Sequence, residues 1–147
     1  MDKRDLEQLL SDVADGTVTP AVALTRIQTA PTADLGFAQL DLSRGVRQGA
    51  GEVVYGAGKT AEQIAAIIEA LHDAGQERIL VTRLDAKKAA RTSEFLDNDI
   101  DLGYVPDAQL ALVGGKPSPT GNGRIVVACA GTSDLPVAEE AALTAEF

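Results

Sequence analysis

The sequence predicts an α/β protein with three parts. An N-terminal helical hairpin is followed by a small, mostly parallel sheet with flanking helices, and then by the first β-turn-α unit of a truncated doubly wound domain. Apolar residues recur at helical spacing in segments that alternate with short β-branched runs, the pattern of βαβ units. A stretch rich in Gly and Pro, residues 114–123, separates these segments from one further strand-turn-helix pattern.

The first 30 residues predict an αα-hairpin that extends from Asp2 to Gln28. Apolar residues at i, i+3, i+4 and i+7 define one face of the first helix: Leu6, Leu9, Leu10 and Val13. Gly16 marks its end, and Thr19-Pro20 is typical of an N-cap followed by proline at the first helical position. This hairpin serves either as a docking arm or as part of a core, and the pattern does not decide between them.

Residues 31–120 are expected to form a small α/β domain. Thr60 and Gln63 have the spacing of a capping box, which predicts a helix that ends at Gly75, and Asp85 caps a second helix through Leu96. The strands are expected at 37–41, 52–55, 79–82, 102–105 and 109–113.

Residues 121–147 are expected to begin a further domain. Arg124–Ala130 predicts a strand, Gly131–Asp134 a tight turn, and Pro136 the start of a helix. A single strand and helix cannot bury a core, so the chain is expected to be cut inside a second domain here, with engineered and proteolytic origins both left open.

Charge and composition exclude several classes of protein. Lys and Arg number 13 against 22 Asp and Glu, a net charge of -9, which argues against a nucleic-acid binder and against a basic membrane-binding face. One Cys and one His exclude an internal disulfide and a Cys/His zinc site. No secretory or membrane-spanning pattern is present, so we expect a cytoplasmic protein. Cys129 lies in an apolar run, which favours a buried structural thiol.

The segment Gly56-Ala57-Gly58-Lys59-Thr60 follows a predicted strand and opens a helix. A P-loop needs the spacing G-x-x-x-x-G-K-[ST], and Val53 stands where its first Gly is required, so we expect no nucleotide triphosphatase. Lys59, Thr60 and the helix amino terminus are candidates for holding a simple anion. Alternatively, the glycines only form the turn and Thr60 only caps the helix.

Two arginines between the first two predicted strands are further candidates. Arg44 and Arg47 are three residues apart, so within a helical turn both would share a face suited to a carboxylate or phosphate. The alternative, which spacing favours, is that they pair with Asp41 and Glu52 and hold the loop.

The turn Gly131-Thr132-Ser133-Asp134 is the most informative segment. It joins a predicted strand to a helix, the position at which α/β sheets bind ligands. Ser133 suits a phosphate or carboxylate, and Asp134 suits a ribose hydroxyl or a cation. Asp134 also fits a plain helix N-cap.

Two motifs resemble those of a known family. The run from Asp41 to Thr60, with Arg44, Arg47, Glu52 and Lys59, resembles the N-terminal signature of the LarB-type pyridinium-3,5-biscarboxylic acid mononucleotide synthases of nickel-pincer cofactor biosynthesis, which serve lactate racemase. The run from Gly131 to Ala141 resembles the start of their second domain, which is similar to the aminoimidazole ribonucleotide carboxylase fold.

The resemblance implies a carboxylase/hydrolase that acts on nicotinic acid adenine dinucleotide, with carbon dioxide or bicarbonate as co-substrate and AMP as a product. It implies no tightly bound cofactor and leaves open whether the enzyme uses Mg2+. It also implies that the complete enzyme is a homo-oligomer. The family's nucleophilic Cys is expected beyond Phe147, a position that Cys129 does not match, so we expect this chain alone to be inactive. Substrate contacts are expected from Gly131, Thr132, Ser133, Asp134, Arg44, Arg47, Lys59 and Thr60. The alternative function is a non-enzymatic module that binds an anion, a nucleotide or a partner protein.

Overall fold

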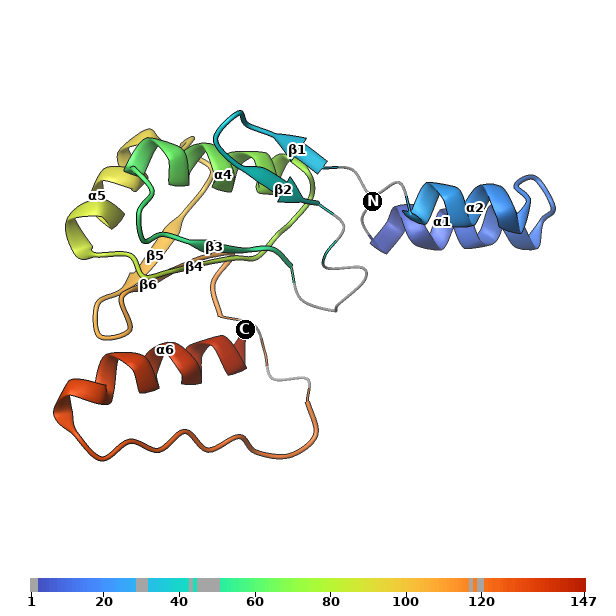
Figure 1. The fold of residues 1–147 in the computed structure, drawn as a ribbon. Coiled ribbons are helices and arrows are strands. Elements are labelled where there is room, and N and C mark those ends of the chain that lie inside the picture. Colours follow the sequence, from blue (N-terminus) through green and yellow to red (C-terminus); the bar gives the residue numbers. More distant parts are fainter. Residues whose placement is uncertain (1–2, 29–31, 43, 45–50, 117, 119–120) are drawn as a thin grey trace.

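The computed structural model describes residues 1–147 except 1–2, 29–31, 43, 45–50, 117 and 119–120 (Figure 1). Its elements, in chain order, are α1 (Lys3–Ala14), α2 (Pro20–Gln28), β1 (Thr32–Asp34), β2 (Gln39–Asp41), β3 (Val53–Tyr55), α4 (Ala61–Asp73), β4 (Ile79–Thr82), α5 (Ala86–Phe95), β5 (Leu102–Val105), β6 (Leu110–Val113), η1 (Thr132–Asp134) and α6 (Leu135–Glu146).

The central sheet has four strands in the order β3-β4-β6-β5. The α/β class is confirmed, but the sheet is mixed rather than mostly parallel, because among its described strands only β3 and β4 pair in parallel. The connections explain the difference. Helix α4 carries the chain back between β3 and β4, whereas β5 and β6 are joined by residues 106–109 alone. A link this short makes neighbouring strands antiparallel.

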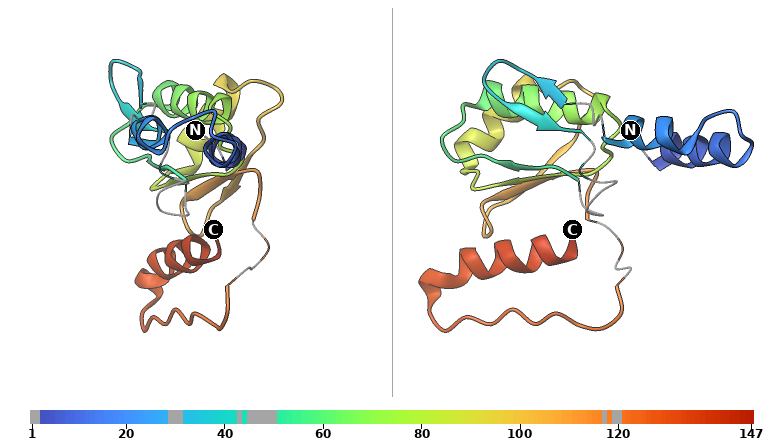
Figure 2. Two further views of the ribbon diagram at one scale, coloured as in Figure 1. Left: turned by 90° about the vertical axis from the view of Figure 1, so that its right-hand side faces the viewer. Right: turned by 45° about the vertical axis from the view of Figure 1, so that its right-hand side comes forward.

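The two middle strands are buried on both faces. Side chains alternate along a strand, so Ile79 and Val81 of β4 join the core beneath α4 and α5, while Leu80 between them joins a second core on the opposite face. Strand β6 divides in the same way, with Leu110 and Leu112 in the second core. Figure 1 and the right view of Figure 2 show α4 and α5 on one side of the sheet and α6 on the other.

Helix α4 supplies most of the first core. Its capping box is confirmed, because Thr60 Oγ1 accepts from the Gln63 amide and Gln63 Oε1 accepts from the Thr60 amide, at 3.2 and 3.0 Å. The stripe Ile64, Ile68 and Leu71 is completely buried. This cap fixes where α4 begins, and therefore where the preceding turn ends.

A short antiparallel ribbon, β1 with β2, packs beside the first core through Leu40. The sequence predicted a strand at 37–41, and the structure confirms its second half as β2. Strand β1 was not predicted. It is three residues long and mostly exposed, so it has no apolar alternation for a pattern to detect.

The N-terminal hairpin is confirmed. Thr19 Oγ1 accepts from the Val22 amide at 3.3 Å, as expected of an N-cap, and Leu9 and Ala23 are buried. Figure 1 shows the hairpin projecting away from the sheet.

The C-terminal segment departs from the prediction. Residues 124–130 are extended, but they form no strand within the described part of the chain. Ile125 and Val126 are 76% and 84% exposed, because no neighbouring strand offers them a ladder or an apolar surface. Helix α6 is confirmed and covers the second face of the sheet through Leu143 and the partly buried Phe147.

Among the residues that the structure describes, two ion pairs attach α6 to the remainder of the chain. Arg83, directly after β4, pairs with Glu140 at 2.9 Å, and Lys116 pairs with Glu146 at 3.1 Å. No helix in the described segments is long and apolar enough to cross a membrane.

Candidate functional site

The turn before α6 leaves a carboxylate available. Gly131 precedes η1, and its carbonyl accepts from the Asp134 amide at 3.0 Å. Asp134 occupies the N-cap position of α6, yet its side chain makes no capping hydrogen bond. Instead, Ser133 Oγ donates to Asp134 Oδ1 at 3.4 Å, a long contact. The plain N-cap interpretation therefore fails for the side chain of Asp134.

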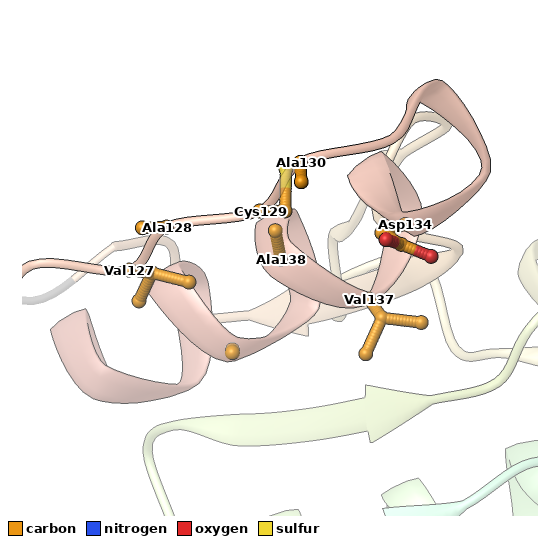
Figure 3. Close-up of a pocket in the computed structure, with 8 residues that line it drawn as sticks. Val127, Ala128, Cys129, Ala130, Asp134, Val137 and Ala138 are labelled. Carbon is orange, nitrogen blue, oxygen red and sulfur yellow. The ribbon is translucent and has the colours of Figure 1, made fainter.

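An open groove lies beside this turn, between the extended segment and α6 (Figure 3). It encloses about 490 Å³, and its lining residues are Val127, Ala128, Cys129, Ala130, Asp134, Val137, Ala138 and Ala141. Apolar side chains form its walls, and Asp134 is the one acidic group among them. Such a surface suits a ligand that combines a flat ring with hydroxyl groups. The ring would lie against the apolar walls, and the hydroxyl groups would donate to the carboxylate.

Cys129 corrects a prediction. The thiol was expected to be buried within a strand, but Cys129 is exposed and lines the groove. The cause is the missing strand partner, since an unpaired extended segment leaves both of its faces open. Among the described residues, no group of three His, Cys, Asp or Glu side chains is placed to hold a metal ion.

Arg44 lies at the amino end of β3. Its Nη1 pairs with Glu52 Oε1 at 3.2 Å, with the two side chains 40% and 20% exposed. This is the loop-holding pair that the spacing favoured. Arg47 lies outside the described residues, and the predicted substrate contacts of both arginines stay predictions.

Lys59 and Thr60 lie beyond the opposite end of β3. Lys59 Nζ donates to the Tyr55 carbonyl at 2.9 Å, and Thr60 is occupied as the cap of α4. Lys88, from α5, donates to the Gly56 carbonyl at 3.2 Å. Both ammonium groups thus stabilise the turn itself. The contacts described here agree with the alternative in which this segment only forms the turn and caps α4.

Gly56 and Gly58 of this turn are each required for a different structural reason. A Cβ at Gly56 would lie 2.9 Å from the Thr82 carbonyl oxygen, and Gly58 has a φ of +79°. The amino end of α4 also holds its own anion, Glu62. A backbone hydrogen bond at Glu62, followed by one with the Thr60 side chain, lowers the pKa of the Glu62 carboxyl. These groups already occupy the positive end of the helix, so it is poorly suited to a second anion.

The structure does not bring all the predicted site residues together. Arg44 lies before β3, Lys59 and Thr60 lie after it, and Gly131–Asp134 lie at the start of α6. Within the described chain, no hydrogen bond or ion pair joins the last group to the others.

Sequence reasoning also missed residues that shape this region. Arg83 has a φ of +55° and its guanidinium holds α6 through Glu140. Gln76 bonds the backbone at the entrance of β3. Neither residue belongs to a recognisable sequence motif, because the contacts of Arg83 with Glu140 and of Gln76 with Glu52 join residues far apart in the sequence.

The comparison with known proteins concerns the sheet region. The pattern of the LarB/PurE-like N-terminal domain family matches residues 32–114, which is more than half of the chain and runs from β1 to the residue after β6. The chain belongs to this family. The match contains the whole Asp41–Thr60 signature, so the predicted LarB-type resemblance is confirmed for this part. The LarB/PurE-like family is carboxylase-like. No curated protein matches the chain.

Proposed function

We propose that this LarB-type chain is part of a carboxylase/hydrolase that converts nicotinic acid adenine dinucleotide to pyridinium-3,5-biscarboxylic acid mononucleotide and AMP, in nickel-pincer cofactor biosynthesis. The family match at residues 32–114 carries the proposal. Carbon dioxide or bicarbonate is the proposed co-substrate, and the proposal includes no tightly bound cofactor. The complete protein is proposed to be a homo-oligomer.

The reaction has two parts whose atoms balance separately. In one, a ring carbon bonds to carbon dioxide and the same carbon loses its proton. In the other, water attacks a phosphorus of the phosphoanhydride, the P–O–P bridge breaks, and AMP leaves. A thiolate that adds to the cationic ring would make it electron-rich enough to attack carbon dioxide. Cys129 does not match the family's nucleophile, so the proposal gives this chain a binding role only.

The groove beside α6 supports a binding role. Its apolar walls suit a pyridinium or adenine ring, and Asp134 accepts hydrogen bonds from ribose hydroxyls without giving up a capping bond. Ser133 Oγ lies beside that carboxylate, and in this proposal its proton turns from the long contact with Asp134 to a phosphate oxygen. Gly131 and Thr132 bring backbone amides to the same turn. In this proposal the substrate seats at residues 131–134.

Calorimetric titration of the 147-residue chain with nicotinic acid adenine dinucleotide, and separately with AMP, tests the proposal. We expect micromolar binding, weakened about tenfold or more by Asp134→Asn and by Ser133→Ala. Asp101→Asn is the matched control, because Asp101 is an exposed carboxylate away from the groove and the charge change is the same. Binding that Asp134→Asn and Ser133→Ala leave unchanged would refute the assigned site, and no binding at millimolar substrate would refute the binding role.

The alternative module that binds an anion at the Gly56–Thr60 turn has a direct test too. Lys59 already donates to a backbone carbonyl, so Lys59→Ala is expected to leave nucleotide affinity unchanged. A tenfold loss in that variant would instead favour the anion-binding module.

A further inference from the structure

We propose that Arg83 is a positioning residue for the groove beside α6. Through its ion pair with Glu140, Arg83 sets the rotation of α6 about its own axis. This rotation keeps the face that carries Asp134 directed away from the sheet and open to a ligand. The expected effect on substrate binding rests on the function proposed above, whereas the effect on the rotation of α6 does not.

Helix α6 has two apolar faces. One packs on the second face of the sheet through the buried Leu143 and the partly buried Phe147. The other lines the groove with Val137, Ala138 and Ala141. At about 100° per residue, the two faces point roughly 140° apart. Figures 1 and 2 show the extended segment on the side of α6 that is directed away from the sheet. Because both faces are apolar, packing alone leaves open a second rotation of α6, in which the groove face docks on the sheet.

Glu140 is a charged residue on the docking face. It lies three residues before Leu143 and seven before Phe147, so it shares their side of the helix. Its side chain is 20% exposed, and its Oε2 lies 2.9 Å from Arg83 Nε. A partly exposed pair of this kind adds little to stability. It does distinguish the two rotations, because turning the groove face toward the sheet would separate the Glu140 carboxylate from its cationic partner.

The backbone at Arg83 is held in place from both neighbouring strands. Its φ of +55° is one that residues with a side chain rarely adopt. Next to it, the Leu84 amide donates to the carbonyl of Gln109, before β6, at 2.7 Å. On the other side, the Gly56 amide, after β3, donates to the Thr82 carbonyl at 2.8 Å. A Cβ at Gly56 would lie 3.3 Å from the Arg83 carbonyl oxygen. The turn at Gly56 therefore leaves room for the bend that directs Arg83 to α6, and strain kept at one such point is typical of a functional position.

Thiol reactivity on the groove face of α6 measures the rotation. In a Cys129→Ser background, Ala141→Cys places the single thiol of the chain on this face, where it should react rapidly with an aromatic disulfide reagent. Arg83→Gly should slow the reaction about threefold or more, because the groove face then docks on the sheet in part of the molecules. Glycine suits the positive φ, so this variant should unfold at no lower urea concentration than the parent. An ion pair that only stabilised the fold would not change thiol reactivity while leaving stability intact.

Exchanging the two charges tests the pair itself. Arg83→Glu alone should also slow the thiol reaction, and the double variant with Glu140→Arg should restore the parent rate. Lys116→Glu is the matched control, since it reverses the charge in the other ion pair of α6. That pair joins Lys116 to Glu146, the last residue of the helix, and both side chains are more than half exposed. We expect the control to leave thiol reactivity unchanged.

Calorimetric titration with nicotinic acid adenine dinucleotide, with Cys129 and Ala141 kept native, tests the consequence for binding. Arg83→Gly and Arg83→Glu should weaken binding about threefold or more, in proportion to the molecules whose groove is covered. The charge exchange should restore the affinity, and Lys116→Glu should not alter it.

The outcomes separate this proposal from the proposed function. Parent thiol reactivity in both Arg83 variants would overturn the positioning role. A loss of affinity without a change in thiol reactivity would overturn it too, since Arg83 would then act on the ligand and not on α6. Failure of the charge exchange to restore the thiol rate would exclude the pair with Glu140. If the native chain binds no substrate but the thiol responds as expected, the proposed function fails and the positioning role of Arg83 stands.

Discussion

The side chain of Gln76 binds both backbone groups of Glu52, as a neighbouring strand would. Its Oε1 accepts from the Glu52 amide at 3.0 Å, and its Nε2 donates to the Glu52 carbonyl at 2.9 Å. Nε2 also donates to the Arg78 carbonyl at 2.8 Å. One amide therefore joins the entrance of β3 to the entrance of β4, and Glu52 in turn holds Arg44.

Replacing Gln76 should destabilise the domain. Gln76→Ala leaves part-buried backbone groups without partners, so we expect the free energy of unfolding to fall by about 1–3 kcal/mol in urea denaturation. Gln76→Glu keeps the shape but places an acceptor against two carbonyls, and should lose at least as much. Gln8→Ala, which removes an exposed contact with Asp12, is the control and should change stability by less than about 0.5 kcal/mol. Equal losses at Gln8 and Gln76 would contradict the bridging role.

The glycines of the Gly56–Thr60 turn should differ in their tolerance of alanine. Gly56→Ala forces a Cβ against the Thr82 carbonyl oxygen and should cost more than about 2 kcal/mol of stability. Gly58→Ala meets open space and should cost only the left-handed backbone penalty, about 1–2 kcal/mol. Gly103→Ala, with its nearest contact at 3.5 Å and an ordinary φ, serves as the control in the same thermal and urea measurements. A Gly56→Ala protein as stable as the Gly103→Ala protein would exclude the close approach.

The phenol of Tyr104 should make stability depend on alkaline pH. Burial, and then the nearby Asp85 charge, raise the pKa of Tyr104 above its ordinary value of 10.0, and its hydroxyl donates to the Leu84 carbonyl at 3.0 Å. A raised folded-state pKa means that the stabilisation is complete below the unfolded pKa and is lost as pH rises through the folded one. Urea titrations from about pH 8 to 11 should therefore show a steeper loss for the native chain than for Tyr104→Phe. Parallel pH profiles would show that the phenol plays no part.

The attachment of α6 to the sheet can be measured through its leucines. Leu143 is buried against Leu80 and Leu110, whereas Leu135 at the other end of α6 is 48% exposed. Leu143→Ala should lower the free energy of unfolding by about 2–3 kcal/mol, and Leu135→Ala by less than about 1 kcal/mol. Hydrogen exchange of the α6 amides should rise in the first variant alone. Equal effects would mean that α6 does not dock through Leu143.

Much of the fold could be predicted because the informative patterns are local. The capping box at Thr60, the cap at Asp85 and the doubly buried run at Ile79 each specify their element within a few residues. The sheet's directions could not be predicted in the same way. They depend on which strands become neighbours, and β6 enters the sheet between β4 and β5.

The candidate site was predictable only in part. Family motifs identified the 41–60 region and the 131–134 turn, but motif spacing does not show which polar groups are already engaged. Lys59 and Arg44 have intramolecular partners, whereas the Asp134 side chain makes no capping bond. Partners such as Tyr55 and Glu52 are decided by tertiary packing, which a single sequence does not display.

The unpaired residues 125–130 have a consequence for handling the protein. The run Ile-Val-Val-Ala-Cys-Ala carries no charge and no proline, and its β-branched members are open to solvent. Such segments nucleate cross-β aggregates, since each chain offers a free edge to the next. Concentrated solutions of this chain should therefore form fibrils or precipitate unless another strand occupies that edge.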